Sequence, residues 1–183
     1  MKRVLLFLLV FLMAVGFAFS ADLMDYPPPL NGGNILVDIG VGYTFPDAAS
    51  AIIKIPPIIA SAEYCLPSVP ISVGALIGFY QYEWDSVSYG WGVETWTYAT
   101  FDARANWHWN IDASWLDLYT GALLGYTYFN SSYSRPYLYA ELKYGGLEFG
   151  AQAGAHFYFS EHFGVVAELG YPFIAKVGLT LKF

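Results

Sequence analysis

The feature that most constrains this chain is a two-residue alternation of apolar and polar side chains, repeated in eight segments after residue 33. The last segment, KVGLTLKF, is typical: Val177, Leu179 and Leu181 alternate with glycine, threonine and lysine, and Phe183 follows. Such alternation predicts β-strands with one apolar face. The segments are residues 34–45, 55–66, 70–84, 96–109, 116–129, 146–159, 163–171 and 176–183.

The connections between these segments alternate in length. Those after the second, fourth and sixth segments are the short turns PSV, NIDAS and SEH, whereas DSVSYGWGVET and NSSYSRPYLYAELKYG are longer. An even strand count, with short turns on one side and longer loops on the other, is typical of an up-and-down antiparallel barrel. The loops PDAASAIIK and PFIA are also short, so we expect a modest external surface.

The composition indicates what such a barrel faces. Of the 183 residues, 56% are apolar, 20% aromatic and only 13% charged, which is unusual for a soluble exported domain. Beyond residue 20, no run approaches the roughly 18 consecutive apolar residues that a spanning helix needs. Only helices and closed barrels satisfy every backbone group in lipid. We therefore predict an all-β fold, an eight-stranded antiparallel transmembrane barrel over residues 34–183 with its apolar face toward lipid.

The first twenty residues predict export. Two basic residues precede a long apolar run, and small residues at positions 18 and 20 favour cleavage before Ala21. The acidic, Pro-rich segment that follows argues against a transmembrane helix. We expect residues 1–20 to be a cleaved signal peptide and residues 21–33, which contain PPP and a glycine pair, to be a periplasmic lead-in.

The net charge argues against one class of partner. The chain has eight basic and fifteen acidic residues, and without the two basic residues of the signal peptide its net charge is −9. Nucleic-acid binding needs Lys and Arg to neutralise phosphates, so we do not expect it. With a single cysteine, Cys65, the fold must be held together without a disulfide framework. We expect no cofactor.

Aromatic residues gather at the ends of the predicted strands, a bias that strand propensity alone does not explain. Amphipathic rings prefer the headgroup level of a bilayer, so we predict two girdles. One, at the periplasmic rim, contains Trp107, Trp109, Trp115 and the terminal anchor Phe183; the other contains Tyr43, Phe79, Tyr126 and Tyr128. The last strand is expected to pair with the first, which removes its exposed edge.

Four segments, in this order, carry a family resemblance: FDARANWHW, LDLYTGALLGYTYF, FGAQAGAHFYFSEHFGVVAELGYPF and KVGLTLKF. Over residues 34–183 the chain resembles the small eight-stranded outer-membrane β-barrel proteins of the OmpX/OmpA/opacity-like superfamily. It departs at Pro172, where the group usually has glycine. The resemblance implies the fold and a bacterial outer-membrane location, and the last strand resembles the signal read by the barrel-assembly machinery. It implies little about activity, because members include adhesins, stabilising proteins and a few lipid-modifying enzymes.

The inward faces carry few charges. Arg104 is the only arginine within a predicted strand and lies about midway along it, and Glu168 is similarly deep. An eight-stranded barrel is only wide enough for its own side chains, and buried charges need partners. We therefore predict a lumen network centred on Arg104, Asp102 and Glu168, with Glu63 or His156 nearby. A structural plug is the favoured interpretation, and a proton or ion path along the same residues is the alternative.

A lipid-modifying enzyme would need a nucleophile, a base and an orienting group close together at the outer leaflet. All three histidines fall near the periplasmic end of the predicted barrel. Ser131, Ser132 and Ser134 of the outer loops have no histidine partner. We therefore expect no enzymatic role.

Two outer loops are rich in aromatic residues, which is typical of recognition surfaces. The alternative is that these residues extend the strands and pack among themselves. The candidates for surface contact are Trp84, Tyr89, Trp91, Trp96, Tyr133, Arg135 and Tyr137. A soluble exported ligand-binding barrel would need the opposite arrangement of faces. We expect an integral outer-membrane monomer with a structural or surface-interaction role, contacting outer-membrane lipids and a surface partner that the sequence does not identify.

Overall fold

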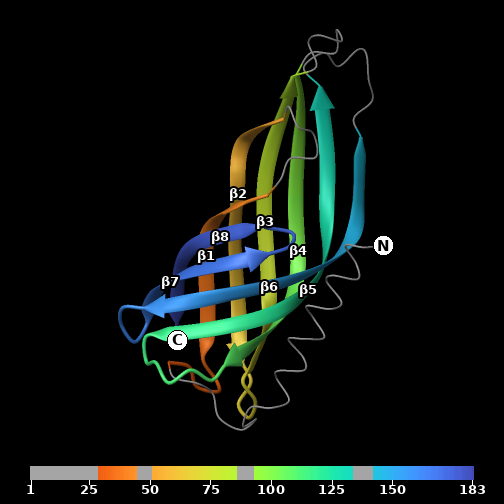
Figure 1. The fold of residues 1–183 in the computed structure, drawn as a ribbon. Helices are drawn as coiled ribbons and strands as arrows, with labels where there is room; N and C mark the ends of the chain where they lie inside the picture. The colour runs from red at the N-terminus through yellow and green to blue at the C-terminus, as the bar shows by residue number, and fades with distance from the viewer. Residues whose placement is uncertain (1–28, 45–50, 86–92, 134–141) are drawn as a thin grey trace, which may run out of the picture.

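The computed structural model describes residues 29–44, 51–85, 93–133 and 142–183, which form a closed antiparallel barrel (Figure 1). Each strand pairs with the next along the chain, and β8 pairs with β1. The strands are β1 (Ile35–Tyr43), β2 (Ile52–Cys65), β3 (Ile71–Asp85), β4 (Val93–Trp109), β5 (Leu116–Tyr133), β6 (Lys143–Tyr158), β7 (Phe163–Gly170) and β8 (Ala175–Lys182). In the described part of the chain, no helix is long and apolar enough to cross a membrane. The predicted eight-stranded antiparallel barrel fold is confirmed.

The seam between β1 and β8 closes the barrel. At one end of the seam Tyr43 lies opposite Ala175. At the other end Phe183 and Ile35 exchange two backbone hydrogen bonds of 2.9 Å each. The ladder thus continues through Phe183, and both edges of β8 are paired. We call the end with Phe183 and the β2–β3, β4–β5 and β6–β7 turns the turn end, and the opposite end the loop end.

The alternation in the sequence becomes an apolar outer face and a polar inner face. Outward side chains are large and exposed: Phe101, Leu169 and Val177 expose 60%, 64% and 58% of their surface. Many inward side chains are charged and buried, such as Arg104, which exposes 2%. Buried charge beneath exposed hydrocarbon is the reverse of the arrangement in a soluble barrel. The inner and outer faces are those that the sequence predicts.

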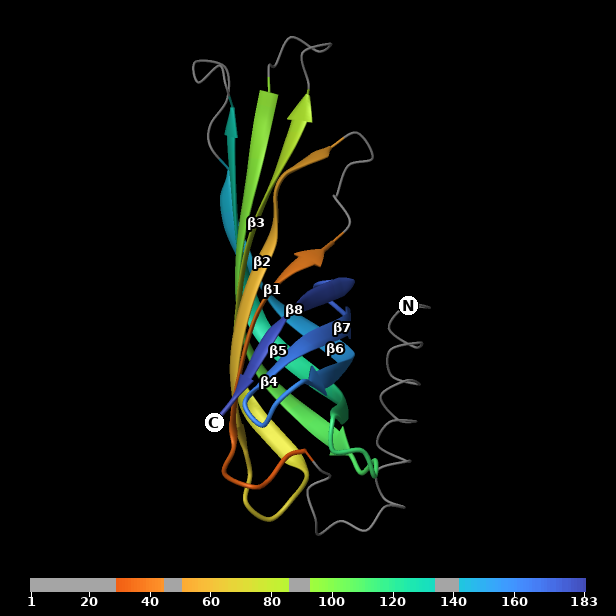
Figure 2. The ribbon, with the colours of Figure 1, turned by 90° about the vertical axis from the view of Figure 1, so that its left-hand side faces the viewer.

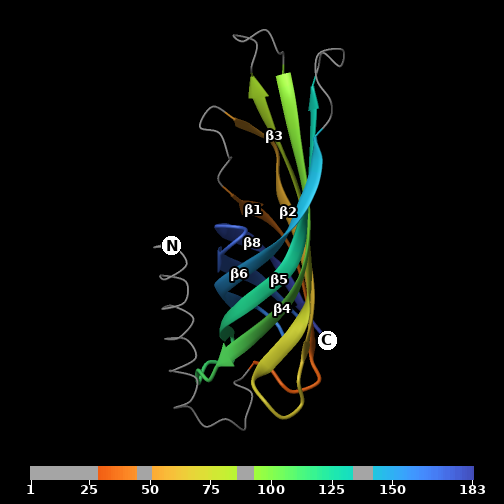
Figure 3. The same cartoon turned by 90° about the vertical axis from the view of Figure 1, so that its right-hand side faces the viewer.

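The barrel is uneven in height (Figures 2 and 3). β3, β4, β5 and β6 contain 15, 17, 18 and 16 residues, whereas β7 and β8 contain eight each. At the loop end, the long strands rise beyond the ends of β1, β7 and β8. We call this part of β2–β6 the tall wall.

The strands of the tall wall are longer than the sequence predicts. β2, β4 and β6 begin at Ile52, Val93 and Lys143, three residues before their predicted starts, and β5 runs four residues further, to Tyr133. In β4, β5 and β6 the added residues pair in regular register, and β5 continues to pair with both of its neighbours up to Asn130. In β2 the register against β3 shifts between Ile53 and Ile55. The added residues mix polar, aliphatic and aromatic side chains. There, backbone hydrogen bonds between neighbouring strands extend the sheet. The side chains do not alternate between apolar and polar, so the sequence does not predict these residues as strand.

Inside the barrel, three layers follow one another from the turn end to the loop end. A small apolar base comes first, a polar layer second and an aromatic cap third. In β2, for example, Cys65 lies in the base, Glu63 in the polar layer and Ile59 in the cap. The base contains Leu30, Leu36, Cys65 and Tyr158, and the cap contains Ile59, Leu76, Tyr80, Tyr82, Tyr98, Leu123, Phe129 and Phe173. The polar layer is therefore shielded at both ends.

The cap includes a residue from a connection that the sequence assigns to the outside. PFIA, between β7 and β8, reads as a short outer loop, but Phe173 turns inward and is buried. Its ring meets Tyr80 edge-on, with the ring centroids 6.0 Å apart, and Tyr80 stacks on Tyr98 at 4.6 Å. A loop phenylalanine has no strand period that indicates its direction. Its burial is decided by the space above the polar layer.

Replacing the capping phenylalanine tests this layer. We expect Phe173→Ala to lower the free energy of unfolding by about 3–5 kcal/mol, because it leaves a cavity among packed rings. Urea unfolding of the purified protein measures the loss. Phe149→Ala is the matched control, since Phe149 exposes 73% of its surface. Equal losses in the two variants would contradict the cap.

Candidate functional site: a closed polar ring inside the barrel

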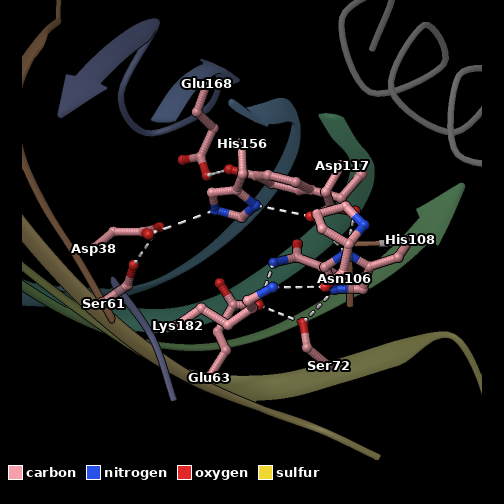
Figure 4. A network of polar contacts seen from close by, with 12 residues as sticks. Asp38, Ser61, Glu63, Ser72, Asn106, His108, Asp117, His156, Glu168 and Lys182 are labelled. Atoms are coloured by element: carbon pink, nitrogen blue, oxygen red, sulfur yellow. Dashed lines mark hydrogen bonds and ion pairs between the residues drawn. The ribbon is translucent and has the colours of Figure 1, made fainter. Parts of the chain in front are cut away.

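The polar layer draws side chains from every strand of the barrel. All of them are inward-facing and buried, and several are shown in Figure 4. Because side chains alternate along a strand, each strand directs polar groups into the lumen. Those at the same level of the barrel form the polar layer. They are Asp38 (β1), Glu63 (β2), Ser72 (β3), Arg104 and His108 (β4), Asp117 (β5), His156 (β6), Glu168 (β7) and Lys176 (β8).

Arg104 is the cation around which one half of this layer is arranged. Its Nε lies 3.1 Å from Glu63 Oε1, and its Nη2 donates to Glu168 Oε2 at 2.8 Å. The same Glu168 oxygen accepts a hydrogen bond of 2.6 Å from the Tyr119 hydroxyl and lies 3.2 Å from Lys176 Nζ. An unpaired charge in such an interior is costly, so each of these groups depends on the others.

Asp117 organises the other half of the layer. Its two carboxylate oxygens lie 2.9 Å from His108 Nδ1 and 2.8 Å from His156 Nδ1. On its far side, His156 Nε2 lies 3.5 Å from Asp38 Oδ1. Lys176 Nζ lies 3.5 Å from the other Asp38 oxygen, which joins this half to Glu168.

Ser72 closes the circuit between the two halves. Its Oγ lies 3.0 Å from His108 Nε2, and its hydroxyl donates to Glu63. The contacts therefore form a closed loop, which we call the polar ring. In order it passes through Asp38, His156, Asp117, His108, Ser72, Glu63, Arg104, Glu168 and Lys176, and returns to Asp38. All eight strands are tied together from the inside.

Three members of the ring have the atomic arrangement of a hydrolase triad. The Oγ of Ser72 faces Nε2 of His108, whose Nδ1 faces the carboxylate of Asp117. All three side chains are completely buried, and the Ser72 hydroxyl is engaged by Glu63. A serine hydroxyl that no substrate can reach does not act as a nucleophile. The three side chains instead connect β3, β4 and β5 by hydrogen bonds.

Sequence reasoning did not find this arrangement, because it considered the serines of the outer loops. Ser72, His108 and Asp117 all face inward within two residues of the turn ends of β3, β4 and β5. Strand parity combined with distance from the turn is the signal that indicates their proximity.

Four of the five predicted lumen residues lie in the ring. Arg104 contacts Glu63 and Glu168 directly, and His156 joins them through Asp38 and Lys176. Asp102 is placed differently from the prediction, which put it at the centre of the network.

Asp102 belongs to a second polar cluster nearer the loop end. Thr100 Oγ1 lies 3.2 Å from Asp102 Oδ2 and donates to Glu148, which also accepts a 2.6 Å hydrogen bond from Thr127. The physical reason is space: Gly125 pairs with Asp102, and a Cβ there would overlap the Asp102 carboxylate. The carboxylate turns over the glycine, toward Glu148.

The predicted girdle residues lie on the outer face or at the turn end. Trp107 and Trp109 are half-buried, and Trp109 Nε1 donates to Thr120 Oγ1 at 3.2 Å. Trp115 is exposed and stacks on Phe157 with the ring centroids 6.1 Å apart. Also exposed are Tyr126, on β5, and Phe183, at the turn end.

The predicted surface residues are described only in part. Trp84 and Trp96, at the top of the tall wall, have ring centroids 6.2 Å apart. Tyr133 is the last residue of β5. Tyr89, Trp91, Arg135 and Tyr137 lie outside the described residues. Within the described ranges, no group of three His, Cys, Asp or Glu side chains is placed to hold a metal ion.

Comparison with known proteins bears on the fold. No protein-family model matches the chain, and no curated protein matches it either. The N-terminal β-barrel domain of Pseudomonas aeruginosa OprF matches with a TM-score of 0.57 and 16% identity, over 84% of this chain and 98% of that one. Ail, the attachment invasion locus protein of Yersinia pestis, in complex with the heparin analogue sucrose octasulfate, matches with a TM-score of 0.57 and 13% identity, over 84% and 100%.

Neisserial surface protein A is a third similar structure, with a TM-score of 0.55 and 10% identity, over 83% of this chain and 96% of that one. At such identities the likeness establishes the fold alone. The chain has the fold of small outer-membrane β-barrel proteins, as the sequence resemblance predicts.

Charge-balanced substitutions test the polar ring. We expect Arg104→Met to lower the free energy of unfolding by about 3–5 kcal/mol, because Glu63 and Glu168 lose their shared cation. Adding Glu63→Gln should recover much of the loss, since one uncompensated charge is removed while Glu168 keeps Lys176. Urea unfolding of the two single variants, Arg104→Met and Glu63→Gln, and of the double variant measures the effect. A double variant with the summed losses of its single variants would show that the groups are not coupled.

Proposed function

We propose that this protein is an integral barrel of the bacterial outer membrane, with a closed lumen and a structural or surface-interaction role. The observation that carries the proposal is the arrangement of its two faces. A continuous apolar surface covers the outside, while charged side chains fill the inside. In water such an apolar face would favour aggregation, whereas a barrel that spans a bilayer needs an apolar face toward the lipid.

The backbone supports the same location. A membrane-spanning sheet must leave no unpaired edge in hydrocarbon. The β1–β8 pairing meets this condition through Phe183. The top of the tall wall, whose outer face carries Thr95, Ser132 and Lys143, would then extend beyond the hydrocarbon. This orientation puts the turn end in the periplasm and the loop end at the cell surface.

A closed lumen is favoured over a pore. The base, the polar ring and the cap occupy successive levels of the interior, and an eight-stranded barrel has room for little more than its own side chains. A proton or ion would have to cross both apolar layers to use the ring. The same closure argues against the enzyme, because it isolates the Ser72–His108–Asp117 group from any substrate.

The surface role rests on the tall wall. It carries Trp84 and Trp96, which are half-buried, and Trp96 packs against the aromatic cap, so a partner would contact the exposed parts of the two rings. Ail's sulfated ligand is not a good guide to that partner, because eight basic residues against fifteen acidic ones disfavour a polyanion. We infer that the protein is exported after removal of residues 1–20, inserted by the barrel-assembly machinery and monomeric among outer-membrane lipids.

The membrane location is tested by extraction and gel migration. We expect the protein to need detergent for extraction, and to migrate differently on a gel before and after boiling, because the closed barrel resists unfolding until heated. A soluble barrel would purify in water without detergent, with Val37, Phe101 and Leu179 shielded from solvent. That outcome would overturn the proposal.

The closed lumen is tested by electrical recording. Protein inserted into planar bilayers is expected to give no large, stable open channel, because three layers of side chains fill its interior. Bilayers treated with protein-free detergent serve as the control for leakage. A reproducible open state of constant conductance would instead favour the pore.

A further inference from the structure

The segment before β1 folds back across the turn end of the barrel. Its residues 29–34 form a strap over the mouth of the lumen, and Leu30 inserts its side chain into the apolar base. There it packs with Leu36, Cys65 and Tyr158, and it is almost completely buried. A leucine from outside the sheet thus completes the layer that closes the polar ring at this end.

The strap is fastened to the strands on both sides of β1. On one side, Gly33 N donates to Cys65 O at 2.8 Å, and Cys65 N donates to Asn34 O at 2.9 Å. On the other side, Lys182 Nζ donates to Pro29 O at 2.7 Å, and Asn34 Nδ2 donates to Phe183 O at 3.2 Å. The strap therefore connects β2 to β8 and spans the strand that forms the closing seam.

The sequence of the strap is suited to this path. Asn34 Oδ1 accepts a 2.7 Å hydrogen bond from Asn31 N, and Asn34 N donates to Asn31 O at 3.2 Å, which closes a tight turn. Gly33 has a φ of 94°, a conformation that glycine adopts without strain. The sequence predicts a periplasmic lead-in over this glycine pair and Asn31. In the structure these residues, with Asn34, form the turn that holds the strap against the barrel.

Lys182 gives the strap a polar anchor. Its side chain is buried, and its ammonium lies 4.8 Å from the centre of the Tyr158 ring. A buried ammonium needs acceptors, and the Pro29 carbonyl supplies one. Losing the strap would take away both the carbonyl that binds Lys182 and the leucine that covers Cys65.

We propose that residues 29–34 are a seal that closes the turn end of the lumen and locks the β1–β8 seam. Release of the strap opens the base to water, exposes Cys65 and Lys182, and loosens the junction between the first and last strands. This inference does not rest on the membrane location, because every contact it uses lies within the barrel and the strap.

The buried thiol of Cys65 reports directly on the seal. In the folded full-length protein, a water-soluble maleimide should label Cys65 far more slowly than in the urea-unfolded chain. Leu30→Ala should raise the labelling rate at least about tenfold, because local opening of a segment follows the contacts that hold it. Lys182→Met keeps the hydrocarbon stem over Tyr158 but removes the bond to Pro29, and should also accelerate labelling.

Ile111→Ala is the matched control, since Ile111 lies in the β4–β5 turn at the same end but outside the base. It should leave the rate unchanged. The far-ultraviolet circular dichroism of each variant, which reports its β-sheet in detergent or in water, shows that the barrel is folded while Cys65 is being labelled. The proposal is overturned if folded wild-type protein reacts as fast as unfolded chain, or if the Leu30 and Lys182 variants react no faster than wild type. A failure to behave as a membrane protein would leave these comparisons intact.

Discussion

The structure depends on one constraint: charges enclosed in a narrow barrel must satisfy one another. Arg104 is fully buried, and two carboxylates from different strands meet it at hydrogen-bonding distance. Those carboxylates are in turn held by Ser72, Tyr119 and Lys176. Since every strand supplies a member of the polar ring, a strand out of register would leave a buried charge or hydrogen-bonding group without its partner, which is costly. The ring therefore specifies the register as well as stabilising it.

The rest of the barrel follows from keeping that ring dry. The aromatic cap at one end and the apolar base at the other exclude water. Each is completed by a residue from outside the regular strands, Phe173 above and Leu30 below. Closing the interior in this way leaves the apolar face of the sheet on the outside, which suits a bilayer. It also leaves the tall wall as the part of the described chain that extends furthest beyond the closed barrel.

Geometry alone is a poor guide to activity in such an interior. Ser72, His108 and Asp117 have the spacing of a hydrolase triad, yet each of their polar groups serves the ring. What distinguishes a catalytic group from a structural one here is access. The same reasoning applies to Asp102, a buried carboxylate that the space over Gly125 brings toward Thr100 and the half-buried Glu148. We therefore assign the function of this protein to its outer surfaces, which a partner can contact.

The sequence by itself determined the number of strands, their antiparallel order and the face that each residue occupies, because side-chain alternation has a fixed period of two. It also indicated that Arg104 and Glu168 are deep and need partners. Tertiary structure alone decided which groups pair, because contacts across the lumen depend on the register of all eight strands at once. It likewise decided the direction of Phe173 and Leu30, since residues outside a strand have no period. The extra length of the tall wall came from backbone pairing, which side-chain patterns do not encode.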